Sequence, residues 1–354
     1  MNNAFIQACL EDLIERYHSA GYFPSASINI FDQKKTLASS CIGEAEEDSL
    51  FDVASVTKIA TATGILKLID GELLDINDQI SDIFEEIRND AWLFKRFQGI
   101  TVRRLLTHTS SLPAWYPFYI WQGDDFWTVL KAAVNSQLPT EGVVYSDLNF
   151  ILLGKLIEKK RGAPLKDCLT RFVTGPLGIE DEMMYQPPTE GKRIVPSCYD
   201  NTIEEQMCRE RGMVFDHWRP RNVPVSGTVN DGNCHYYFGD VSGHAGIFAT
   251  ARAYQTLCQA YMRTEKPVFL EAQKEQTISP GRGLGFETTT MYPHGCGHNG
   301  FTGTSIYFSS QYNIGVVALT NRLYFQTPSG KNVGEFRRAL HEMAFSLSRA
   351  MKGR

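Results

Sequence analysis

The residue pair whose types and spacing first suggest chemistry is Ser55 and Lys58, in the segment S-V-T-K. Residues three apart lie on the same face of a helix, so the Lys58 ammonium can reach the Ser55 hydroxyl. Serine becomes a nucleophile when a base removes its proton, and a desolvated lysine with a lowered pKa can be that base. A helix start also offers backbone N–H groups that favour developing negative charge. Alone, however, S-x-x-K is more often a capped helix start than a catalytic pair.

Six stretches, in the right order, resemble the serine β-lactamase and penicillin-binding-protein superfamily, whose enzymes carry S-x-x-K and K-T-G motifs. They span roughly residues 20 to 325 and are F-D-V-A-S-V-T-K-I-A-T-A-T-G-I-L-K-L-I-D-G from residue 51, I-T-V-R-R-L-L-T-H-T-S-S-L-P from 100, Y-S-D-L-N-F-I-L-L-G-K from 145, G-P-L-G-I from 175, G-H-A-G-I-F-A-T-A from 243 and H-N-G-F-T-G-T from 298. By this resemblance the chain is identified as a member of the superfamily.

The resemblance implies a role for each matching position. Ser55 would be acylated and Lys58 would help to deprotonate it. Tyr145 would be the second proton carrier, its phenolate favoured by the nearby ammonium. The backbone N–H groups of Ser55 and Phe301 would form the oxyanion hole, and Gly300 would let the substrate lie close to the strand edge. No cofactor is implied.

Two positions depart from the family pattern, and both concern substrate binding. The strand motif usually begins with Lys, but here His298 precedes Asn299, and an imidazole is largely neutral at pH 7. The tyrosine motif usually ends in Asn, but here it ends in Asp147, which we expect to pair with a substrate amine or to hold Lys58 charged. Both changes favour an ester, or a peptide bound by its amino end, over an acidic penicillin-type substrate. Acid pH should partly reverse this preference by protonating His298.

The elements that would position these residues follow from hydrophobic periodicity. We expect helices over roughly 1–17, 55–70, 145–160 and 333–351, and strands at 26–31, 36–42, 284–291, 304–308 and 314–319. Strands at both ends predict an α/β (α+β) fold in which an antiparallel sheet, flanked by helices, is built from both chain ends. We expect one catalytic domain, 1–354, with a sheet lobe of about 1–71 and 236–354 and an inserted helical lobe of about 72–235.

The composition of the chain limits the classes of molecule that we expect it to bind. The chain has 354 residues, 43% of them hydrophobic, and a net charge of -5 without segregated blocks, which offers no field for nucleic acid or anionic lipid. A small-molecule ester, amide or peptide is the expected partner. The alternation of His294, Cys296 and His298 lacks a nearby fourth ligand, so we expect no metal. No stretch is long and apolar enough for a membrane span, and the N-terminus has no basic start, so the sequence predicts a cytoplasmic protein.

The function predicted from the sequence is that of a serine hydrolase with a Ser55 acyl-enzyme intermediate, acting as an esterase or an aminopeptidase-like enzyme. A β-lactamase or D,D-carboxypeptidase is the first alternative. A non-catalytic binding module that kept the fold is the alternative of another class, although the joint presence of Ser55, Lys58 and Tyr145 argues against it. The aromatic cluster from Trp115 to Trp127 is expected to pack in the core or a lid, or to form an acyl-binding wall. The sequence indicates neither the substrate nor the oligomeric state.

Overall fold

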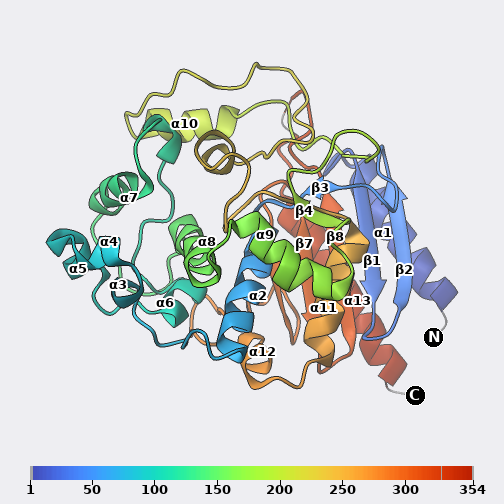
Figure 1. The fold of residues 1–354 in the computed structure, drawn as a ribbon. Coiled ribbons are helices and arrows are strands. Elements are labelled where there is room, and N and C mark those ends of the chain that lie inside the picture. Colours follow the sequence, from blue (N-terminus) through green and yellow to red (C-terminus); the bar gives the residue numbers. More distant parts are fainter. Residues whose placement is uncertain (1–2, 328, 353–354) are drawn as a thin grey trace.

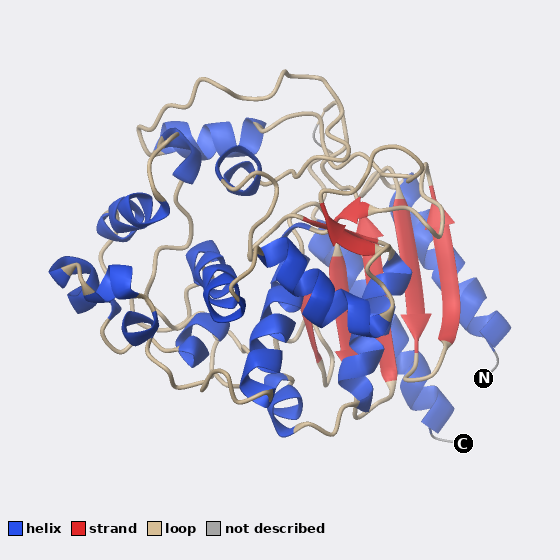
Figure 2. Cartoon of the chain, in the orientation of Figure 1, coloured by secondary structure: helices blue, strands red, loops and turns tan. Residues whose placement is uncertain are grey.

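The computed structural model describes residues 3–327 and 329–352, and its main sheet is built from both ends of the chain (Figures 1 and 2). The five strands are antiparallel, in the order β2-β1-β8-β7-β6. Their bounds are β1 (Ala26–Phe31), β2 (Thr36–Ile42), β6 (Cys296–Asn299), β7 (Ser305–Ser309) and β8 (Ile314–Thr320). β1, the first strand of the chain, pairs with β8, the last strand, along its whole length. The N-terminal and C-terminal parts of the chain therefore meet inside the sheet. The predicted architecture is confirmed.

Helices cover both faces of this sheet. Alternate residues of a strand point to opposite faces. Val316 and Ala318 of β8 pack with α1 (Asn3–Ser19) and α13 (Val333–Lys352), whereas Val317 and Leu319 pack with α2 (Thr57–Asp70) and α11 (Ala251–Arg263). Burial on both faces explains why β8 is apolar throughout rather than alternating.

The remaining helices lie mainly to the side of the sheet (Figure 1). They are α3 (Ile80–Ile83), α4 (Glu85–Arg88), α5 (Ala91–Phe97), α6 (Val102–Leu106), α7 (Phe126–Asn135), α8 (Asp147–Arg161), α9 (Leu165–Leu169), α10 (Thr202–Glu210) and α12 (Pro267–Ala272). A small second sheet joins β3 (Phe51–Asp52), β5 (Ile247–Ala249) and β4 (Met183–Tyr185). One cluster of buried apolar side chains runs from α4 and α7 through α8 and α2 to β8. On that ground we propose a single catalytic domain with the two lobes expected from the sequence.

The prediction of a strand over 284–291 is wrong, and the error matters for the site. The edge strand is β6, and the earlier segment touches it through a single bridge between Glu287 and Gly297. A side chain at Gly283 would lie 2.2 Å from the Ala272 carbonyl oxygen, and Gly285 has a φ of 90°. These glycines therefore let the segment bend tightly against α12 instead of extending. Among the described residues, no helix is both long and apolar enough to cross a membrane.

Candidate active site

Ser55 lies in a short 3-10 turn, residues 54–56, directly before α2. Ala54 in this turn has a φ of 47°, a conformation uncommon for any residue with a side chain. The buried Asp52 carboxylate accepts hydrogen bonds from the N–H groups of Ala54, at 2.8 Å, and of Asn230, at 2.6 Å. Burial raises the pKa of Asp52 to about 6, against the effect of these two bonds. Asp52 thus holds the strained turn that presents Ser55.

Lys58 lies one helical turn further on and is fully buried. Its Nζ donates to Ser55 Oγ at 2.9 Å, to Asp147 Oδ1 at 2.8 Å and to the His244 carbonyl oxygen at 3.2 Å. The predicted proximity of Ser55 and Lys58 is therefore present, and all three ammonium protons have acceptors.

The expected lowering of the Lys58 pKa is wrong. Burial lowers this pKa, but the charge of Asp147 and the hydrogen bonds with Asp147 and Tyr145 outweigh burial and raise it above its ordinary value. Lys58 is consequently an ammonium ion at neutral pH. Of the two expectations for Asp147, the structure favours the one in which it keeps Lys58 charged.

Tyr145 lies just before α8, with its ring 4.9 Å from Lys58 Nζ. Burial raises the pKa of its hydroxyl, while the charge of Lys58 and hydrogen bonds from Lys58 and Ser55 lower it; the net result is a raised pKa. His108 holds the segment of Tyr145 and Ser146 in place, because its Nδ1 accepts a hydrogen bond from the Ser146 N–H at 3.1 Å. Tyr145 is thus in contact with both members of the S-x-x-K pair.

The turn after β6 is fastened directly to the segment before Ser55. The Thr302 hydroxyl donates to the Asp52 carbonyl oxygen at 2.8 Å, and the Thr304 hydroxyl to the Val53 carbonyl oxygen at 2.9 Å. A side chain at Gly300 would lie 2.5 Å from the same Val53 oxygen, so only glycine fits this approach. Phe301, next along the turn, is 44% exposed at the cavity.

His298 and Asn299 lie on β6, and the burial of His298 gives its imidazole a different protonation behaviour from the one predicted from the sequence. His298 is 1% exposed, its Nδ1–H donates to the Asn299 carbonyl oxygen at 2.8 Å, and its buried Nε2 has no hydrogen-bond partner among the described residues. Burial, followed by the charges of Lys58 and Arg282, holds its pKa well below 6.5. The expectation that mild acid would charge His298 is therefore wrong.

A cavity of about 550 Å³ opens over these groups. The predicted site residues that line it are Ser55, Tyr145, Asp147, Asn299, Gly300 and Phe301, whereas Lys58 and His298 lie behind its wall. Sequence reasoning missed seven other charged residues of the lining, which are Glu204, Asp231, Arg282, Glu287, Arg322, Lys331 and Arg337. None of them belongs to a recognisable motif, and the sequence signal nearest to Arg282 is its position between two glycines.

The aromatic side chains from Trp115 to Trp127 mainly pack against other aromatic side chains of the protein. Phe118 and Tyr119 are buried, and their rings contact Tyr237 and Phe215 respectively. Trp115 alone of the cluster lines the cavity beside Ser55. An acyl-binding wall built from the whole cluster is therefore wrong for this chain, although Trp115 can contribute one apolar side.

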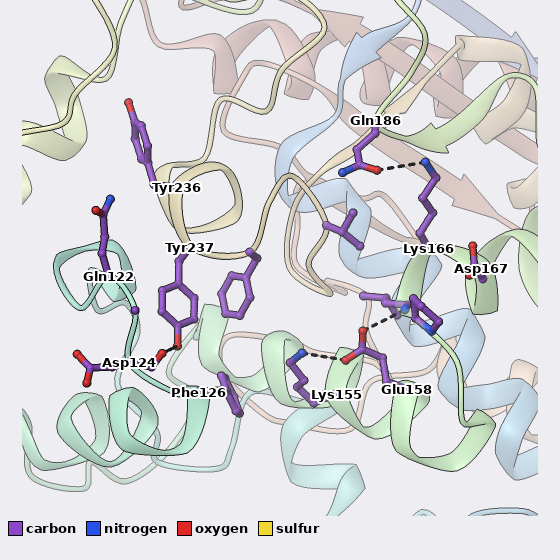
Figure 3. Close-up of a pocket in the computed structure, with 15 residues that line it drawn as sticks. Gln122, Asp124, Phe126, Lys155, Glu158, Lys166, Asp167, Gln186, Tyr236 and Tyr237 are labelled. Carbon is purple, nitrogen blue, oxygen red and sulfur yellow. Dashed lines mark hydrogen bonds and ion pairs between the residues drawn. The ribbon is translucent and has the colours of Figure 1, made fainter.

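A second hollow, of about 700 Å³, is lined by residues of α7, α8 and α9 (Figure 3). Lys155 Nζ donates to Glu158 Oε2 at 2.9 Å and Lys166 Nζ to Gln186 Oε1 at 3.1 Å. These polar groups satisfy one another, and Ser55 is not part of the lining. The cavity over Ser55 is therefore the candidate active site.

One group of side chains has the spacing of metal ligands: atoms of Asp147, Asp231 and His244 lie within 4.8 Å of one another. These ligand atoms are already paired within the chain, because Asp147 Oδ1 accepts from Lys58 Nζ and Asp231 Oδ1 lies 3.0 Å from His244 Nε2. We therefore route no chemistry through a metal.

Comparison with known proteins agrees with the geometry. Residues 10–335 match the family model described as Beta-lactamase. The chain belongs to the β-lactamase family. An N-acetylmuramyl-L-alanine amidase of Bacillus subtilis (strain 168) is 26% identical over 360 residues, covering 88% of this chain and 80% of the relative. A putative D-alanyl-D-alanine carboxypeptidase of Escherichia coli (strain K12) is 26% identical over 312 residues, covering 79% and 70%.

The solved structures show the same fold. A class C beta-lactamase superposes with a TM-score of 0.70 at 17% identity, covering 98% of this chain and 97% of the other. Because this family consists of serine hydrolases, the chain is a serine hydrolase of the β-lactamase-related class.

Proposed function

We propose that this enzyme hydrolyses an ester or an amide through an acyl-enzyme intermediate on Ser55. The observation that carries the proposal is the 2.9 Å contact between Lys58 Nζ and Ser55 Oγ at the base of the cavity. In the first step Ser55 Oγ bonds to the substrate carbonyl carbon, and the bond to the leaving alcohol or amine breaks as that group takes up a proton. Water then hydrolyses the Ser55 ester and releases the acid.

Tyr145 is the proton acceptor in this proposal, and Lys58 is its fixed cation. The two groups interact strongly and titrate as a pair. Since Asp147 favours the ammonium form of Lys58, the proton that is missing from the reactive form is the one on Tyr145. The phenolate takes the Ser55 proton as Oγ attacks, and Tyr145 returns it to the leaving group.

The charge that develops on the substrate oxygen needs donors on the opposite side. The backbone N–H groups of Ser55 and Phe301 are our candidates, because the turn after β6 is fastened to residues 52 and 53. Asn299, beside this turn, has a buried Oδ1 with no partner among the described residues and is a candidate acceptor for a substrate N–H.

Amide or ester hydrolysis is our first choice, and a β-lactamase or D,D-carboxypeptidase activity is the second. The amidase relative supports an amide substrate. Arg282, a buried cation in the cavity, is the specific observation in favour of the second, since it offers an acidic substrate the charge that His298 lacks. A non-catalytic module is disfavoured because its fold would not require Ser55, Lys58 and Tyr145 in mutual contact.

The test compares wild type with Ser55→Ala, using Ser19→Ala, an exposed serine on α1, as the matched control. A fluorophosphonate should label wild type and the control but not Ser55→Ala, and turnover of p-nitrophenyl esters or aminoacyl amides should fall at least about a thousandfold. Unchanged melting temperature would show that the fold is kept. Labelling that persists in Ser55→Ala refutes the nucleophile, and labelling without turnover of any ester, amide or nitrocefin supports the binding module.

A further inference from the structure

The catalytic cavity adjoins a further hollow of about 500 Å³, which we call the α10 hollow. The residues that line both volumes are Glu204, Asn230, Phe301, Arg322 and Lys331. The rest of the α10 hollow is formed mainly by the start of α10, the loop before it and the segment after β8, and its large apolar side chains are Tyr199, Ile203, Leu323 and Phe325. A molecule that reacts with Ser55 can therefore extend past the shared residues into the α10 hollow.

Phe301 stands where the two volumes meet. Its ring is 44% exposed, and its backbone N–H is one of the two candidate donors to the substrate oxygen. Arg322 holds this residue, because its Nε donates to the Phe301 carbonyl oxygen at 2.7 Å and its Cζ lies 4.9 Å from the centre of the Phe301 ring. The position of the ring is thus fixed, and a group that packs against it lies close to the reacting carbonyl.

The apolar side chains around the α10 hollow are incompletely covered by the protein. Ile203 is 45% exposed, and Leu323 and Phe325 are only partly buried. The rings of Tyr199 and Tyr324 stack at 4.6 Å and 14°, which joins the loop before α10 to the segment after β8. The hollow is therefore preformed. Exposed apolar side chains that gather around a preformed hollow beside a reactive group are typical of a ligand site.

Charged residues also line the α10 hollow, but they are engaged within the protein. Asp200 Oδ1 accepts from the Thr202 N–H at 3.0 Å, at the start of α10. Lys331 Nζ lies 5.6 Å from the centre of the Tyr22 ring, and Arg322 is held by Phe301 as described. A charged ligand would have to displace these contacts, whereas an uncharged one would not.

Glu204, the remaining charged residue of this lining, is held in its neutral form. Its Oε1 accepts from the Gly232 N–H at 2.9 Å, and its Oε2 is buried. Burial, followed by the charge of Asp231, raises the pKa of Glu204 well above its ordinary value. The wall shared with the catalytic cavity therefore adds no negative charge at this point, which again favours an uncharged occupant.

We propose that the α10 hollow is part of the substrate site and binds an uncharged aromatic group, of about the size of a phenyl ring, carried by the molecule that acylates Ser55. This inference rests on the proposed acyl transfer at Ser55 and specifies the substrate class of the same site. A ring that is partly buried in the hollow should improve binding by about tenfold. Stacking against an aromatic side chain such as Phe301 adds to this gain.

The ring can lie on either side of the bond that is cleaved, and two pairs of esters distinguish these cases. Ethyl hydrocinnamate and ethyl propionate differ by a ring on the acyl side, and phenethyl acetate and ethyl acetate differ by a ring on the alcohol side. Monoethyl succinate carries a carboxylate in place of the ring of ethyl hydrocinnamate. The readout is the concentration of each ester that halves the initial rate of Ser55 labelling by a small fluorophosphonate, which measures occupancy without requiring turnover.

We expect one of the two ring-bearing esters to protect Ser55 at about a tenfold lower concentration than its ring-free partner. Monoethyl succinate should show no such gain over ethyl propionate. The pair that shows the gain identifies whether the α10 hollow holds the acyl part or the leaving group.

Two substitutions of Ile203 test whether the ring lies in the α10 hollow. Ile203→Asn replaces an apolar wall by a polar one and should remove most of the gain, whereas Ile203→Leu keeps an apolar side chain of the same volume and should retain it. Leu138→Asn, at an 85% exposed leucine outside both linings, is the matched control and should leave the gain unchanged. The melting temperature and the labelling rate without ester verify that each variant is folded and that Ser55 is reactive.

The outcomes separate this inference from the proposed function. If ring-bearing and ring-free esters protect equally, or if monoethyl succinate protects as well as ethyl hydrocinnamate, the aromatic subsite is refuted while the Ser55 nucleophile stands. A gain that survives in Ile203→Asn also refutes it, because the ring would then lie elsewhere, for example against Trp115 in the catalytic cavity. Absence of Ser55 labelling in wild type refutes the proposed function itself.

Discussion

The half of the site carried by α2 and α8 and the half carried by the end of the sheet differ in how completely their polar groups are paired. On the helical half, every proton of the Lys58 ammonium has an acceptor, and Asp147 is one of these three acceptors. On the sheet half, buried atoms of His298, Asn299 and Arg282 have no partner among the described residues. Because unpaired buried groups destabilise a fold, the contrast assigns the two halves different tasks. The paired half is built to keep the reacting groups in place, and the unpaired half is built to be completed by substrate.

The largest effect should come from breaking the paired half. Lys58→Met removes the cation and leaves Asp147 beside a buried gap, so we expect a loss of kcat/KM of at least about a thousandfold and a stability loss of up to about 3–5 kcal/mol. Chemical denaturation and ester turnover measure the two losses. In the double variant Lys58→Met/Asp147→Asn the carboxylate charge is gone, so stability should largely return while activity does not.

Lys266→Met is the matched control, because Lys266 and Asp70 form an exposed pair. Its effect on stability should stay within about 0.5 kcal/mol. If Lys58→Met retained more than about a tenth of the activity, Lys58 would be a structural cation and the helical half would not be the catalytic one.

Gly300→Ala should be nearly as damaging, although it changes no charge. The new methyl group would lie 2.0 Å from Thr304 Oγ1 and 2.5 Å from the Val53 carbonyl oxygen, so the turn after β6 must move away from Ser55. A displacement of about 1 Å can cost on the order of a hundredfold in rate, which steady-state kinetics will show. Gly71→Ala, at the end of α2 with its nearest contact at 3.3 Å, should remain close to wild type. Equal activity of the two variants would remove the turn from the reaction.

Asp147→Asn should move the pH profile without abolishing activity. The Asp147 charge raises the pKa of both Lys58 and Tyr145, so its removal lowers both. The rising limb of kcat/KM, set by loss of the Tyr145 proton, and the falling limb, set by loss of the Lys58 proton, should both shift to lower pH. Asp70→Asn is the control. A rising limb that stays in place contradicts Tyr145 as the proton acceptor.

The smallest effect concerns His298 on the sheet half. Because its pKa is held well below 6.5, the ratio of reactivity toward nitrocefin and toward a neutral ester should stay constant within about twofold from pH 8 to pH 5.5. The depressed pKa of His298 also makes the free energy of unfolding depend on pH. Below about pH 6.5 the unfolded chain binds a proton at His298 that the folded chain does not bind, so the folded state loses stability as the pH falls below that value. Wild type should therefore lose stability relative to His298→Gln between pH 7 and pH 5.5. A ratio that rises severalfold in acid would show a charged His298.

Local spacing and motif order allowed the helical half to be predicted, whereas long-range packing decided the other. Ser55 and Lys58 are three residues apart on one helix, so their contact needs no tertiary information. The sign of the Lys58 pKa shift comes instead from Asp147, 89 residues away in sequence, and it reverses the expectation from burial alone. Arg282 was not predicted because it belongs to no motif, and the close packing of Gly283 against α12 is a long-range contact that brings Arg282 beside Tyr145.

The two hydrogen bonds of the Asp52 carboxylate couple the size of the bound molecule to the reactivity of the nucleophile. One bond holds Ala54 in its positive-φ conformation, and the other holds Asn230, which lines the cavity. A molecule that moves the Asn230 segment outward would pull on its hydrogen bond with the Asp52 carboxylate. The same carboxylate holds the turn that carries Ser55. We therefore expect an oversized substrate to be disfavoured in two ways, by the wall that it displaces and by the loss of the conformation that presents Ser55.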